Sequence, residues 1–141
     1  QECWLAAIAA MDEAGWPGRR LVIGGKSLGG RVASLVADQA AVAGLVCLGY
    51  PFHPAGRPEK TRTEHLATLA TPTLIVQGTR DALGTRQDVA GYDLAKDIRI
   101  EWLEDGDHSF KPRRKSGRTE AENWQHGIDA VATFVAALSD S

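Results

Sequence analysis

The sequence predicts an α/β fold, a doubly wound and mainly parallel sheet with helices on both faces. Strand-like apolar runs alternate with helix-like stretches, at crossover lengths of about 20–25 residues. Most of these runs lack the alternation of a half-exposed strand, which is typical of strands covered on both faces. A serine between glycines follows the first run directly, at Gly25, Ser27 and Gly29. We therefore expect one domain over residues 1–141, organised around this strand, turn and helix.

The composition is that of an ordinary globular domain. Of the 141 residues, 43% are hydrophobic and 24% are charged, and the formal net charge is −2. This charge provides no attraction for nucleic acid or an anionic membrane, and no apolar run approaches the ~20 residues that cross a bilayer. Cys3 and Cys47 lack metal or redox spacing, and Cys47 reads as a small buried hydrophobe. We expect a reducing, cytoplasmic setting, a small-molecule substrate, and no metal or other cofactor.

Four apolar runs are predicted strands: 20–24, 44–49, 73–77 and 98–103. The last run alternates polar and apolar residues, which favours an edge strand with one wetter face. Helices are predicted over 2–14, from Ser27 to near Gln39, over 85–95, and after an N-cap at Thr119, with a helical turn at 65–69. The final helix carries one apolar stripe that we expect to be buried: Trp124, Ile128, Val131, Val135 and Leu138.

The serine and its glycines match G-x-S-x-G, a strand-to-helix turn with the serine at its apex. In such a turn the backbone of Ser27 is strained and its hydroxyl projects above the sheet edge. The helix that follows points its free N–H groups at whatever the serine attacks, so the Leu28 N–H is an expected oxyanion donor. A glycine-rich corner without chemistry would show the same motif, so its meaning depends on partners elsewhere in the chain.

Two further reactive side chains follow later strands. Asp81 comes after the third run and His108 after the fourth, and the C-terminal ends of parallel strands meet at one edge of a sheet. These positions predict a nucleophile at Ser27, a base at His108 and an orienting acid at Asp81. Asp81 could instead be a turn or cap residue and His108 a solvated loop residue, while Asp88 and Asp107 compete as the acid.

Three other side chains are candidates for the pocket wall: Lys26, Tyr50 and His53. His53 follows the second strand, so it becomes the alternative base if His108 points away from the serine. The other histidines, His65 and His126, are expected in structural or surface positions. The scattered histidines and acids do not have the spacing of a metal site.

Six segments together resemble one branch of the α/β-hydrolase superfamily: 24–31, 49–54, 57–60, 65–66, 77–81 and 105–108. It is the dienelactone-hydrolase-like branch, which includes the hydrolase-like domains of an NSL chromatin-complex subunit and a testis-expressed protein. The resemblance covers nearly the whole chain and implies the α/β-hydrolase fold, with nucleophile Ser27, acid Asp81 and base His108. Dienelactone hydrolases themselves use a cysteine where this chain has Ser27.

Relative to such a fold, the chain lacks the opening strands and the loop with the second oxyanion donor, so we expect these upstream of Gln1. The strand at 20–24 would then be an exposed edge through which copies could pair. The expected function is a serine hydrolase that cleaves an ester, thioester or small amide through an acyl-enzyme. The alternative is a non-catalytic interaction module on the same fold, and the intact Ser27, Asp81 and His108 favour the first.

Overall fold

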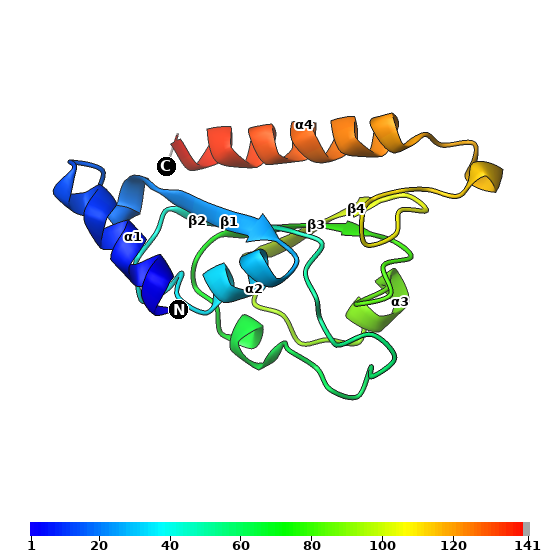
Figure 1. The fold of residues 1–141 in the computed structure, drawn as a ribbon, viewed down its shortest axis with the longest axis horizontal. Helices are drawn as coiled ribbons and strands as arrows, with labels where there is room; N and C mark the ends of the chain where they lie inside the picture. Colours follow the sequence, from blue (N-terminus) through cyan, green and yellow to red (C-terminus); the bar gives the residue numbers. More distant parts are fainter. Residues whose placement is uncertain (140–141) are drawn as a thin grey trace.

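The computed structural model, which describes residues 1–139, contains one sheet of four parallel strands between two helical layers (Figure 1). The strands lie in sequence order: β1 (Val22–Lys26), β2 (Gly44–Leu48), β3 (Thr73–Gly78) and β4 (Ile98–Leu103). Every neighbouring pair is parallel, so the C-terminal ends of all four strands meet at one edge. The α/β fold class is confirmed, and β4 is an edge strand as expected.

The two faces of the sheet are covered differently. The long helix α4 (Glu120–Ser139) runs across one face, and α1 (Glu2–Glu13), α2 (Leu28–Ser34) and α3 (Arg86–Val89) lie toward the other (Figure 1). Short 3-10 turns add Gly18–Arg20, η2 (Glu64–Ala67) and Arg114–Ser116. The larger apolar core lies on the α2 side, and a smaller one beneath α4 contains Leu74, Val76, Leu103, Phe110 and Ala130.

The first strand and its helix differ from the predicted bounds. β1 begins and ends two residues later than the predicted 20–24, because Gly25 and Lys26 continue the pairing with Cys47 and Leu48. Cross-strand pairing thus overrides the poor strand propensity of glycine. The following helix ends at Ser34 rather than near Gln39, and the chain continues as turns that still bury the next apolar residues.

The predicted helix over 85–95 is also wrong in extent, because only Arg86–Val89 is helical. Thr85 caps it through a reciprocal pair of hydrogen bonds with Asp88. Beyond Val89 the backbone leaves the helix, and the N–H of Ala95 donates to the carbonyl of Leu66 at 2.9 Å. The chain after α3 therefore bonds to η2 and does not continue as a helix.

Helix α4 begins as predicted, but the expected buried stripe is wrong. The Glu122 N–H donates to Thr119 Oγ1, and the Thr119 N–H donates to Glu122 Oε2, which forms a capping box. The residues turned to the sheet are Asn123, Gly127 and Ala130, whereas three members of the stripe are exposed by 36–55%: Trp124, Ile128 and Val135. Gly127 allows the close approach, since a Cβ there would lie 3.4 Å from the Val76 side chain.

Within residues 1–139, no helix combines the length and the apolar character that a membrane span requires.

Cys47 is buried as predicted, with 1% of its surface exposed, and burial raises the pKa of its thiol to about 12. This inert thiol matches the expected small hydrophobe.

Asn123 joins α4 to the loop after β4, and its loss should destabilise the fold. Its buried Nδ2 donates to the carbonyls of Glu104 (3.1 Å) and Phe110 (2.9 Å), and its Oδ1 accepts from Arg118 Nε (2.6 Å). We predict that Asn123→Ala lowers the free energy of unfolding by about 2–3 kcal/mol, because buried carbonyls lose their donor. Urea denaturation followed by circular dichroism measures the change.

The matched control for this prediction is Gln125→Ala, two residues along α4. Gln125 is exposed and bonds Asp129 on the same helix, a contact worth only about 0.2–0.5 kcal/mol. An Asn123→Ala variant no less stable than this control would contradict the structural role of Asn123.

Candidate active site

The site begins at the turn between β1 and α2, where Ser27 has φ 51° and ψ −119°. This left-handed conformation is costly for a residue with a side chain, and surrounding contacts must hold it. The Ser27 N–H donates to the carbonyl of Leu48 at 2.8 Å, and its carbonyl accepts from the Arg31 N–H at 3.1 Å. The strained serine is therefore anchored to β2 on one side and to α2 on the other.

Glycines allow β1 and α2 to approach each other closely enough to form this turn. A Cβ at Gly25 would lie 2.8 Å from the backbone carbon of Gly29, and a Cβ at Gly30 would lie 2.6 Å from the carbonyl oxygen of Gly25. Neither backbone atom can give way as a flexible side chain would. The spacing of these glycines in the sequence is thus explained by steric contact.

The structure brings together the three side chains that the sequence singled out. His108 lies in the loop after β4, and its Nε2 is 2.9 Å from Ser27 Oγ. Its Nδ1 is 2.8 Å from Oδ2 of Asp81, which follows β3. With a proton on Nδ1 donated to the carboxylate, Nε2 is free to accept the serine proton.

Asp81 is completely buried, so its carboxylate depends on hydrogen bonds from the protein. Oδ1 accepts the backbone N–H of Leu83 at 2.8 Å. Oδ2, the oxygen that faces His108, also accepts from Gln77 Nε2 at 3.0 Å. These donors stabilise the ionised form and fix the direction in which the carboxylate meets the imidazole.

Gln77 is a supporting residue that the sequence analysis missed. It is fully buried in β3, and its Oε1 accepts the Tyr50 N–H at 2.8 Å. Its Nε2 also faces the carbonyls of Tyr50 and Gly84, each at 3.2 Å. Gln77 thereby joins the end of β2 to the loop that carries Asp81. A glutamine at the end of an apolar strand run, four residues before a candidate acid, was the available signal.

Lys26, a predicted pocket residue, supports the loop after β4 that carries His108, which we call the histidine loop. Its Nζ donates to the backbone carbonyl of His108 at 3.0 Å and lies 5.5 Å from the centre of the Phe110 ring. Gly49, which directly follows β2, also lies beside His108. Its φ is 65°, and a Cβ there would lie 3.3 Å from His108 Cε1. Glycine is therefore required beside the imidazole.

A carboxylate network fixes the loop that leads to His108. Asp105, at φ 54°, accepts from the backbone and the guanidinium of Arg113, and its carboxylate is also paired with Arg80. The Arg113 guanidinium holds the pKa of Asp105 well below its usual range. This carboxylate is committed to the loop rather than to His108.

The remaining predicted pocket residues, Tyr50 and His53, are both buried. Tyr50 is completely buried, and its hydroxyl donates to the carbonyl of Arg62 at 2.9 Å. His53 is 3% exposed, with Nδ1 2.8 Å from the Pro54 carbonyl and Nε2 3.5 Å from Asp88 Oδ2. His108, and not the alternative His53, therefore lies beside Ser27.

The competing acids and histidines also have other partners. Asp88 caps α3, and Asp107 accepts the N–H groups of Ser109 and Lys111. His126 lies 2.7 Å from Glu101 Oε1, and His65 Nε2 lies 2.8 Å from Ser34 Oγ. In the described part of the chain, histidine, cysteine and acidic side chains form no group of three that could hold a metal ion.

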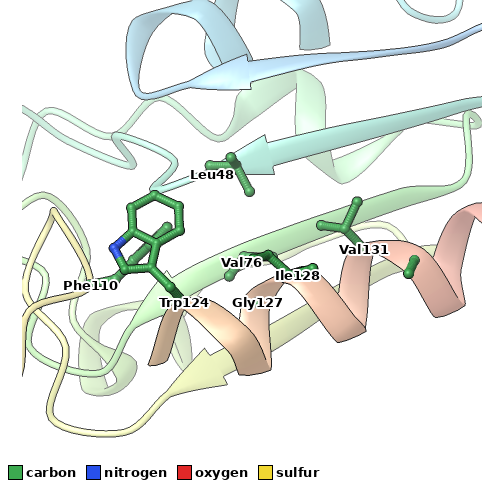
Figure 2. Close-up of a pocket in the computed structure, with 8 residues that line it drawn as sticks. Leu48, Val76, Phe110, Trp124, Gly127, Ile128 and Val131 are labelled. Atoms are coloured by element: carbon green, nitrogen blue, oxygen red, sulfur yellow. The ribbon is translucent and has the colours of Figure 1, made fainter. Parts of the chain in front are cut away.

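An apolar hollow of about 350 Å³ adjoins the histidine loop on the α4 side of the sheet (Figure 2). Trp124 and Ile128 of α4 lie across it from Leu48, and Phe110 lies beside Trp124 (Figure 2). The exposed stripe of α4 therefore lines an open hollow rather than the core.

A protein-family model described as an alpha/beta hydrolase domain matches residues 1–136. The match spans nearly all of the chain, including the serine turn and both loops that carry the other two side chains. The parallel sheet, with these side chains at the C-terminal ends of its strands, agrees with it. The chain therefore belongs to the alpha/beta hydrolase domain family.

Proposed function

We propose that the protein is a serine hydrolase that cleaves an ester, thioester or small amide through an acyl-enzyme intermediate. The observation that carries this proposal is the imidazole of His108, with Ser27 Oγ at 2.9 Å from one nitrogen and Asp81 at 2.8 Å from the other. Family membership supports hydrolase activity in general, and this geometry favours a serine mechanism in particular.

In the acylation half-reaction, Ser27 Oγ attacks the substrate carbonyl carbon while His108 Nε2 takes the hydroxyl proton. The tetrahedral intermediate then collapses, and His108 gives that proton to the departing alcohol, thiol or amine. The acyl group stays on Ser27. Asp81 remains ionised and stabilises the imidazolium that forms between the two steps.

In the deacylation half-reaction, His108 takes a proton from a water molecule that attacks the acyl carbon. Collapse of the second tetrahedral intermediate frees the acid and returns the proton to Ser27. The N–H of Leu28 is our assigned donor to the oxyanion, because it opens α2 and has no acceptor within the helix. One such donor is worth ~10²–10³ in rate.

The proposal also covers the branch of the family, the kind of substrate and the cellular setting. The motifs around Ser27, Asp81 and His108 favour the dienelactone-hydrolase-like branch, with a small molecule as the substrate. A cytoplasmic setting is supported by Cys3 and Cys47, which are both free thiols.

The nucleophile can be tested with a fluorophosphonate probe. We predict that the protein is labelled at Ser27, and that Ser27→Ala abolishes labelling and lowers p-nitrophenyl acetate hydrolysis by several orders of magnitude. Ser109→Ala is the matched control, because Ser109 is exposed beside His108 and should leave both readouts unchanged. A cooperatively folded protein without labelling would favour the non-catalytic module, and labelled Ser27→Ala would reject the assignment.

Gln77→Met tests whether Gln77 positions the acid. Methionine has a similar volume but cannot donate to Asp81, so we predict that kcat/KM falls by about 10-fold or more. The loss should lie in kcat, with KM for p-nitrophenyl acetate nearly unchanged, because Gln77 acts through Asp81 and His108 and does not touch the substrate.

The control for this variant is Gln87→Met, at an exposed position on α3. Both variants are compared at equal folded fraction, determined from thermal melts. An unchanged kcat in folded Gln77→Met would contradict the positioning role and leave Gln77 as a core residue only.

A further inference from the structure

A second group of polar side chains lies between α2 and the segment after β2, with no member in common with the triad. Arg31 comes from α2, four residues after Ser27, and Arg62 and His65 come from the loop and η2 that follow the second strand. They line a cavity of about 620 Å³ together with Leu35, Thr61, Glu64 and Thr68. Two cationic side chains thus border the same open space.

Neither guanidinium in this cavity has a counter-ion among residues 1–139. No carboxylate lies within ion-pair distance of Arg31 or Arg62, although Glu64 is on the same wall. The Nε of Arg31 is shielded from solvent and has no hydrogen-bond partner. A buried cationic N–H without an acceptor is unfavourable, so an anion bound beside this guanidinium would stabilise it.

The neighbouring histidine, His65, is neutral and adds no charge to the cavity. The Ser34 hydroxyl donates to the Arg31 carbonyl at 2.6 Å, so it accepts from His65 Nε2 at 2.8 Å. Burial and the nearby Arg31 charge lower the pKa of His65 and outweigh the opposing effect of Glu64, which favours the neutral imidazole. The cavity therefore carries two arginine charges and one carboxylate, that of Glu64, next to a neutral imidazole that can report on a bound anion.

We propose that this cavity binds a compact oxyanion, the phosphate or carboxylate group of a small molecule. Arg31 and Arg62 supply charged donors suited to such groups, and the hydroxyls of Thr61 and Thr68 supply neutral donors on the walls. The site is independent of the hydrolytic chemistry at Ser27 and would operate equally in a non-catalytic module.

NMR titration of the whole protein with sulfate and with acetate tests the proposal, with sodium chloride at matched ionic strength as the reference. Sulfate stands for a phosphate group but does not itself titrate near neutral pH. We expect saturable shifts of His65 resonances with at least one oxyanion, at a dissociation constant of about 1 mM. The pKa of His65 should rise when the anion is bound, because the anion offsets the charge of Arg31.

Variants identify the residues responsible for binding. Arg62→Gln should weaken oxyanion binding by about 10-fold or more, and Arg31→Gln should do the same if it folds. Arg57→Gln is the matched control, since Arg57 is exposed on the same loop and does not line the cavity. Shifts no larger than those with chloride, or equal weakening by Arg57→Gln and Arg62→Gln, would overturn the proposal.

Discussion

The parallel register of the sheet is the constraint on which the rest of the structure depends. Lys26 pairs with Leu48, and Gly78 pairs with Leu103, so the chain leaves β1, β3 and β4 near one edge. The residues that follow these strands form the serine turn, the loop that carries Asp81 (the acid loop) and the histidine loop. Ser27, Asp81 and His108, which are 54 and 27 residues apart in the sequence, thus meet at this edge. A change in register would separate them, which links the stability of the sheet directly to the chemistry.

A buried polar network then converts this approximate proximity into a defined geometry. Gln77 ties the acid loop to the end of β2, and Lys26 holds the histidine loop from β1. Asn123 attaches the same histidine loop to α4. Each of these side chains bonds a backbone group of a segment distant from it in the sequence. The catalytic arrangement that we propose is therefore supported from the strands and from the long helix together.

The strands and the three site residues were predictable from the sequence because each has a local signal. Apolar runs mark the strands, the glycine spacing marks the turn, and Asp81 and His108 follow strand ends. Helix lengths were less predictable, since the bond from Ala95 to Leu66 that shortens α3 joins segments far apart in the chain. The buried face of α4 was misjudged for a similar reason. Its apolar stripe has helical spacing, but Gly127 brings a different face against Val76.

The hydrolysis that we propose passes through an acyl group on Ser27. The most direct measurement is rapid acid quenching of the protein with p-nitrophenyl acetate, followed by peptide mass mapping during the first turnover. We expect one acetyl group on the peptide that contains Ser27, formed at the rate of the p-nitrophenol burst. Acetyl on Lys26 in its place, or steady product release with no acetylated peptide, would contradict it.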